Sequence, residues 1–273
     1  MTVHDRTGRC AMTLPTSAPL PPPAPAPTVW PLPFWIAHRG AGRLAPENTL
    51  AAFRVGASHG FRAFECDVKL SADGVPFLLH DATLERTTSG RGLAGDLPWS
   101  ALARLDAGGW HGPAFAGEPL PTLQAVARHV LAAGHALNVE IKPTPGKDAE
   151  TGRTVAAEAQ RLWHSAAAPP LLSSFRREAL AAAREAAPSL PRALLLDALA
   201  PGWLDAALAL GCAGIVCKHT LIDAALAEAV HGAGLRLAAY TVNEPGEAAR
   251  LKVLGIDGLI TDAVDRFMPS AAG

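Results

Sequence analysis

Net charge, aromatic residues and long hydrophobic runs are all scarce in this sequence. Its 24 Lys and Arg residues are balanced by 25 Asp and Glu, which leaves a formal net charge of −1. This balance argues against the broad basic surface that binds nucleic acid, so we expect no nucleic-acid partner. No apolar run approaches the roughly 20 residues that cross a bilayer, and we expect no stable membrane insertion.

Cysteine is scarce too. The four cysteines, Cys10, Cys66, Cys212 and Cys217, have neither zinc-ligand spacing nor a paired framework, which indicates buried thiols in a reducing compartment. The first 33 residues hold nine of the 24 prolines, and these interrupt the apolar segment that a signal peptide needs. We therefore expect a cytoplasmic protein in which residues 1–33 form a proline-rich, poorly ordered extension.

From residue 34 onward, short apolar runs alternate with alanine-rich stretches of helical length. The runs occupy residues 34–38, 62–68, 136–142, 170–175, 192–197, 213–219, 235–241 and 257–261. Such alternation is typical of parallel strands joined by helices, and eight strands are the number in a closed TIM barrel. The predicted fold of residues 34–273 is therefore α/β, a (β/α)8 barrel.

One segment breaks the alternation. "SADGVPFLLHD", residues 71–81, is predicted to be a turn and a further extended piece without an intervening helix. Residues 82–121 are polar, glycine-rich and irregular. We therefore expect a small inserted subdomain here, after the second barrel strand. Loops of this length in compact domains are usually functional.

Three carboxylates are predicted to meet at the mouth of the barrel, where the carboxyl ends of the strands lie. Glu65 and Asp67 are two apart on the second strand and so point to the same side, and Glu140 lies near the end of the third strand. Three converging carboxylates repel one another unless a cation lies among them. Oxygen ligands suit a hard ion, so we expect one divalent metal, Mg²⁺ or Ca²⁺.

Basic residues and histidines end the same strands. Arg39 and Lys142 supply positive charge beside the carboxylates, which suits an anionic group, and phosphate fits best. His38 and His80 then suit a general base and a general acid at a phosphorus centre. Either histidine fits either role.

These residues lie in motifs that resemble those of the glycerophosphodiester phosphodiesterase family, most closely its bacterial cytosolic members. The motifs are "IAHRGAGRLAPENTLAAF", "FECDVKLSADGVPFLLHDATLERTT", "LNVEIKP", "YTVN" and "LITDAVD", and the resemblance extends over residues 35–268. It implies a TIM barrel with a small inserted subdomain. It also implies hydrolysis of glycerophosphodiesters, such as glycerophosphocholine and glycerophosphoethanolamine, to sn-glycerol 3-phosphate and an alcohol.

The resemblance assigns a role to each residue of the predicted site. The paired histidines of the family correspond to His38 and His80, its metal carboxylates to Glu65, Asp67 and Glu140, and its phosphate-contacting residues to Arg39 and Lys142. Many members carry tryptophan at the position of Tyr240, the single tyrosine of this chain, which is expected to line the substrate pocket.

Other interpretations remain to be tested. "GAGRLA", residues 40–45, fits the loose glycine pattern of a dinucleotide-binding fold, although "PENT" delays the helix that should hold a pyrophosphate. A non-catalytic phosphate-binding barrel is a second alternative. A lysophospholipase D-type enzyme acting on lysophospholipids is a third. For assembly, the sequence leaves a homodimer open.

Overall fold

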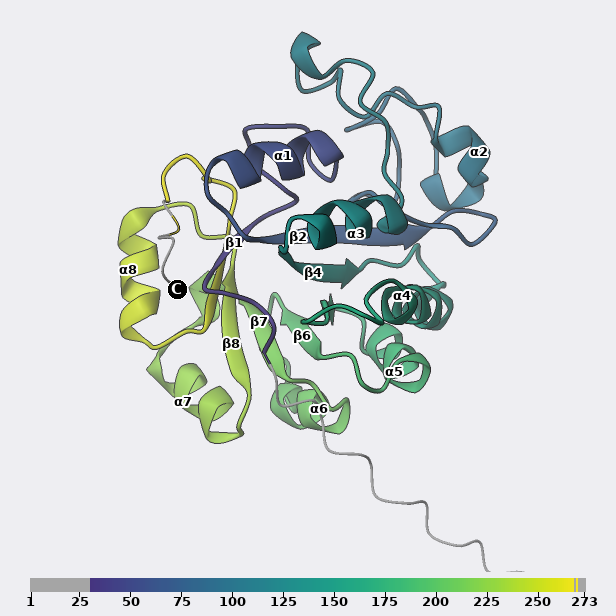
Figure 1. Ribbon diagram of the computed structural model, residues 1–273. Coiled ribbons are helices and arrows are strands. Elements are labelled where there is room, and N and C mark those ends of the chain that lie inside the picture. The colour runs from purple at the N-terminus through teal and green to yellow at the C-terminus, as the bar shows by residue number, and fades with distance from the viewer. Residues whose placement is uncertain (1–29, 268, 270–273) are drawn as a thin grey trace, which may run out of the picture.

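The computed structural model describes residues 30–267 and 269, in which eight parallel strands close into a barrel (Figure 1). Each neighbouring pair is parallel, and β1 pairs with both β2 and β9, which closes the sheet. The barrel strands are β1 Trp35–Ala37, β2 Ala63–Leu70, β4 Ala136–Ile141, β5 Leu171–Ser174, β6 Arg192–Leu196, β7 Gly214–Lys218, β8 Arg236–Tyr240 and β9 Gly258–Thr261. The predicted TIM barrel is confirmed, and a closed barrel is incompatible with the dinucleotide-binding alternative.

Seven helices form the outer layer of the barrel among the described residues. They are α1 Leu50–Ser58, α3 Leu123–Ala132, α4 Asp148–Leu162, α5 Arg177–Ala186, α6 Trp203–Ala209, α7 Ala224–Gly232 and α8 Pro245–Val253. Several begin at a side-chain cap: Thr49 accepts from the Ala52 amide, and Asp223 accepts from the Leu226 amide. All of them except α3, which follows the inserted subdomain, come after a barrel strand, and each buries at least one alanine.

The segment that breaks the alternation extends β2 beyond the barrel. The short strand β3, Pro76–Leu78, pairs antiparallel with β2, so that Lys69 lies opposite Phe77. The chain then forms a subdomain that contains α2, Trp99–Leu102, and returns at Thr122 to begin α3 (Figure 1). This subdomain has its own small core, which includes Phe77, Leu79, Leu84, Leu102 and Leu120.

An apolar cluster fills the interior of the barrel. It includes Ile36, Leu171, Val216 and Ile260, and the buried side chain of Leu32 packs with it. Residues 30–33, which the sequence analysis grouped with the extension, thus include one residue of the barrel core. The rest of the predicted extension, residues 1–29, lies outside the described residues.

Among the described residues, no helix has the length and apolar character that crossing a bilayer requires.

Candidate active site

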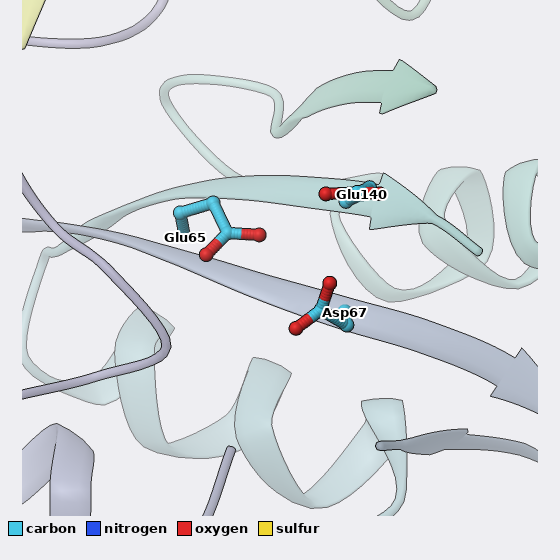
Figure 2. A group of neighbouring side chains, drawn as sticks. All are labelled: Glu65, Asp67 and Glu140. Carbon is cyan, nitrogen blue, oxygen red and sulfur yellow. The ribbon is translucent and has the colours of Figure 1, made fainter. Parts of the chain in front are cut away.

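The three predicted carboxylates converge at the carboxyl end of the barrel. Glu65 and Asp67 lie on the same face of β2, and the register of β2 with β4 places Glu140 opposite Asp67. Ligand oxygens of all three residues lie within 4.8 Å of one another, and the three side chains are buried (Figure 2). The strand period therefore brings together the cluster that the sequence predicts.

Burial makes this cluster electrostatically unfavourable without a cation. Burial and the neighbouring charge of Asp67 raise the pKa of Glu65 to about 8, and the same two causes raise the pKa of Glu140. Burial also disfavours the ionised form of Asp67, but Lys142 and Arg39 outweigh it and hold the Asp67 pKa well below its usual range. Oε1 of Glu65 has no hydrogen-bond partner among the described residues. A buried set of oxygen donors of this kind fits a hard divalent cation.

Two basic side chains border the carboxylates, as predicted. The Nζ atom of Lys142 lies 2.9 Å from Oε1 of Glu140 and 3.1 Å from Oδ1 of Asp67. The Nε atom of Arg39 lies 3.3 Å from Oδ2 of Asp67. Both basic side chains therefore lie next to the carboxylates, and they line one cavity together with Glu65 and Glu140.

The loop between β1 and α1 orients Arg39 through an unusual backbone conformation. Arg39 has a φ of 50° and Asn48 a φ of 61°, in the left-handed region that asparagine tolerates best among residues with a β-carbon. In this conformation the Arg39 amide donates to Oε2 of Glu65 at 3.1 Å. Asn48 donates to Oδ2 of Asp67 at 2.8 Å and accepts from the Asp67 amide at 3.1 Å. The loop thus fixes two carboxylates of the cluster.

His38 is held by a carboxylate that directly follows the last strand. Its Nδ1 atom lies 2.6 Å from Oδ1 of Asp262, and its Nε2 atom lies 3.7 Å from Oε2 of Glu65. Asn243 donates to Oδ2 of Asp262 at 3.2 Å and accepts from the Asp262 amide at 2.8 Å. Burial lowers the pKa of His38, but Asp262 and Glu65 outweigh burial and raise it overall.

His80 has a carboxylate partner of its own. Its Nδ1 atom lies 2.6 Å from Oδ1 of Asp81. Arg86 donates through Nε to Oδ2 of Asp81 at 2.6 Å and through both Nη atoms to Glu47, each at 2.8 Å. Glu47 also accepts from Arg39 at 2.9 Å, so one network joins the segment of His80 to Arg39. Burial lowers the pKa of His80.

A cavity of about 150 Å³ opens at the carboxyl end of the barrel and is lined by most of these residues. Seven of the eight predicted site residues line it: His38, Arg39, Glu65, His80, Glu140, Lys142 and Tyr240. Asp67, the eighth, is buried beside them. The other walls include Phe175, Leu195 and Ile260.

Tyr240 and Phe175 form the aromatic side of this cavity. Their ring centroids are 5.9 Å apart at an angle of 85°, an edge-to-face arrangement. The Tyr240 hydroxyl donates to the carbonyl of Leu196 at 3.1 Å, which fixes the ring in place. The cavity therefore has one charged side and one aromatic, apolar side.

A larger cavity of about 670 Å³ lies at the opposite, amino-terminal end of the barrel. It is lined by residues that include Pro31, Arg62, His135 and Trp163, and none of the predicted site residues belongs to it. Since chemistry in TIM barrels takes place at the carboxyl ends of the strands, the smaller cavity is the candidate active site.

The structure brings the eight predicted residues together, but the sequence assigned no role to the residues that hold them. These are Glu47, Asn48, Asp81, Arg86 and Asp262, together with Lys69, which donates to two backbone carbonyls. Asp262 follows β9 directly and Asp81 lies three residues beyond the end of β3, and those positions near strand ends were a usable signal. The partnerships of Asn48 and Arg86 depend on loop conformations that no local pattern encodes.

Buried carboxylates that suit a divalent cation, next to cations that suit a phosphate, define a TIM-barrel hydrolase acting on phosphate esters. The sequence matches the glycerophosphoryl diester phosphodiesterase family over residues 38–266. This match extends over most of the chain, which therefore belongs to that family. It is an enzyme, a glycerophosphodiester phosphodiesterase, as the resemblance predicted.

Individual relatives agree with this assignment. A glycerophosphodiester phosphodiesterase of Caldanaerobacter subterraneus is 32% identical over 232 residues, which cover 83% of this chain and 93% of that protein. A solved structure of an Oleispira antarctica phosphodiesterase in complex with the product sn-glycerol-3-phosphate is 34% identical. Its TM-score is 0.80, over 86% of this chain and 95% of its own. The glycerophosphodiester phosphodiesterase of Agrobacterium tumefaciens is 28% identical, with a TM-score of 0.72 over 87% of this chain and 99% of its own.

Proposed function

We propose that this enzyme hydrolyses small soluble glycerophosphodiesters, such as glycerophosphocholine and glycerophosphoethanolamine, with one bound Mg²⁺ or Ca²⁺ ion. The products are sn-glycerol 3-phosphate and the free alcohol. The observation that carries this proposal is the cavity itself, in which two carboxylate-supported histidines face a buried cluster of three carboxylates.

Glu65, Asp67 and Glu140 would hold the metal ion. When bound, such an ion neutralises phosphate charge and lowers the pKa of a nearby hydroxyl or water. Oxygen donors are common to Mg²⁺ and Ca²⁺, so the donor set supports both ions equally. Arg39 and Lys142 bind the phosphate oxygens that remain, since both cations line the cavity beside the carboxylates.

His38 and His80 transfer the protons. Nδ1 of His38 is engaged by Asp262 and Nδ1 of His80 by Asp81, so each ring is left with Nε2 for exchange with the substrate. One histidine removes a proton from the attacking hydroxyl, and the other protonates the leaving alkoxide oxygen. The attacking hydroxyl is either water or the neighbouring hydroxyl of glycerol. In the second case a cyclic phosphate forms first, and water then opens it.

The size and lining of the cavity favour a small polyol as the buried part of the substrate. A volume of about 150 Å³ suits a glycerol unit, with Tyr240 and Phe175 against its carbon atoms, and not an acyl chain. A lysophospholipid substrate remains the alternative. Comparison of the rate on glycerophosphocholine with the rate on micellar lysophosphatidylcholine separates the two proposals.

A cytoplasmic location is part of the same proposal. Cys66, Cys212 and Cys217 are free, buried thiols, and free thiols persist in a reducing compartment. Fractionation of cells followed by detection of the full chain tests the location. Sedimentation of the purified chain would test the homodimer that the sequence leaves open.

Release of sn-glycerol 3-phosphate from glycerophosphocholine is the decisive experiment. We expect turnover by the purified enzyme, loss of turnover in EDTA, and recovery with Mg²⁺ or Ca²⁺. Turnover that persists in excess EDTA would contradict the metal dependence. A folded enzyme that is inactive on soluble diesters with either ion, but active on lysophospholipid, would favour the alternative substrate.

A further inference from the structure

A lysine ammonium is buried near the end of β2, beside the active site. Lys69 shares one face of the strand with Glu65 and Asp67, and only 1% of it is exposed. Buried charges in proteins are usually paired with a charge of opposite sign. The hydrogen-bond partners of Lys69 Nζ are instead two backbone carbonyl oxygens, that of His80 at 3.0 Å and that of Lys142 at 3.3 Å.

These carbonyls belong to two of the residues that we propose to act on the substrate, and the two residues come from different segments. His80 follows β3, whereas Lys142 follows β4. The backbone of β2 already contacts both segments: the Leu79 amide donates to the Asp67 carbonyl at 3.1 Å, and the Lys142 amide donates to the Val68 carbonyl at 2.9 Å. Lys69 completes this junction by joining the two segments through a single nitrogen atom.

An apolar side chain of similar length, such as methionine, would fill the same space without burying a charge. The ammonium, in contrast, forms charge-assisted hydrogen bonds, which are stronger than neutral ones. We propose that Lys69 is a positioning residue that sets the spacing between His80 and Lys142, and so aligns proton transfer with the phosphate. This inference rests on the roles proposed above for those two residues.

The test compares Lys69→Met with Lys69→Arg in the full chain, with the metal supplied. For Lys69→Met we expect kcat to fall at least tenfold, with KM, metal affinity and the midpoint of urea unfolding close to those of the wild type. Lys69→Arg keeps a charged donor and should recover most of the rate. Lys147→Met, at an exposed lysine in the loop between β4 and α4, is the matched control and should stay within twofold of wild type.

A double-mutant cycle separates positioning from general damage. In a His80→Ala background, Lys69→Met should lower kcat by less than a further threefold, because the proton transfer that Lys69 aligns is already lost. A fully additional tenfold loss in that background would overturn the proposal, and so would wild-type kcat in Lys69→Met. Equal losses of kcat in Lys69→Met and Lys69→Arg, together with unfolding at lower urea concentrations, would also overturn the proposal.

Two safeguards keep the test decisive. If Lys69→Met does not fold, Lys69→Gln takes its place: a lowered kcat in a folded protein supports the proposal, and an unchanged kcat overturns it. The wild-type rate on glycerophosphocholine is measured first. An inactive wild type would count against the proposed substrate, whereas an active wild type with an unimpaired variant would count against the role of Lys69 alone.

Discussion

The Nδ1 atom of His38 lies 2.6 Å from Oδ1 of Asp262, although 224 positions separate the two residues in the sequence. Closure of the barrel produces this contact, because β1 pairs with β9 as well as with β2. The Asp262 carboxylate fixes the orientation of the His38 ring and stabilises its protonated form. Partners of this kind determine which ring nitrogen is free to exchange a proton.

Replacement of Asp262 by asparagine should therefore lower both the pKa of His38 and the rate. The shape of the side chain is kept but its charge is lost, and that charge helps to hold the His38 pKa above its ordinary value. We expect kcat to fall about 10–100-fold. NMR titration of His38 in the metal-free protein, with steady-state kinetics, measures both effects. Glu247→Gln is the matched control, since Glu247 accepts from His219 at 2.6 Å away from the cavity lining.

His80→Ala should remove nearly all turnover but leave a measurable residual rate and preserve the fold. His80 is partly exposed at the cavity wall, so its loss removes a proton-transfer group without emptying the core. Loss of such a group typically costs about 10²–10⁴ in rate. The measurement is kcat together with circular dichroism, and His164→Ala, at an exposed histidine, serves as the control. Full activity in His80→Ala would remove this residue from the mechanism.

Metal affinity should depend steeply on pH. The pKa of Glu65 is raised from 4.5 to about 8. Without a bound cation, this carboxyl group therefore stays mostly protonated at any pH below about 8. A cation must displace the proton, and its apparent dissociation constant should rise about tenfold for each pH unit below about 8. Calorimetry in buffers of different ionisation enthalpy should detect the released proton near pH 7. An affinity that stays constant between pH 6 and 8 would contradict this prediction.

Two glycine-to-alanine substitutions in helices should act in opposite directions. A β-carbon on Gly56, inside α1, would overlap the carbonyl oxygen of Gly40 and lie 2.9 Å from Cε1 of Phe64. We expect Gly56→Ala to destabilise the protein by about 1–3 kcal/mol in spite of the better helix propensity of alanine. Gly232, the last residue of α7, has open space at the corresponding point, so Gly232→Ala should be neutral or stabilise by less than about 1 kcal/mol. Urea unfolding of both variants gives the comparison.

The fold could be predicted because each of its elements carries a local pattern. All eight apolar runs named in the sequence analysis are barrel strands, and the seven surrounding helices follow from alanine-rich segments. The extended piece before the insertion is β3, which pairs antiparallel with β2 and is not a ninth barrel strand. The end of the extension was less predictable: Leu32 lies between prolines in sequence but packs inside the barrel.

The candidate site was predictable only in part, for a physical reason. Strand period and strand order place Glu65, Asp67 and Glu140 together, and both can be inferred from local sequence. The pairing of Arg86 with Glu47 instead depends on how the subdomain folds over the first loop. Similarly, the contacts of Asn48 with Asp67 need a left-handed backbone conformation, which asparagine permits but does not require.

The pairing of β1 with β9 also has a consequence for biosynthesis. The His38 amide donates to the Thr261 carbonyl at 2.9 Å, and the His38 ring depends on Asp262, so the first strand is complete only when the last one has joined it. On the ribosome, His38 is made more than 200 residues before its partner. A nascent or prematurely terminated chain that stops before β9, Gly258–Thr261, therefore lacks both the β1–β9 pairing and the carboxylate partner of His38. We therefore expect full hydrolytic activity only from chains in which synthesis has passed Asp262 and β9 has paired with β1.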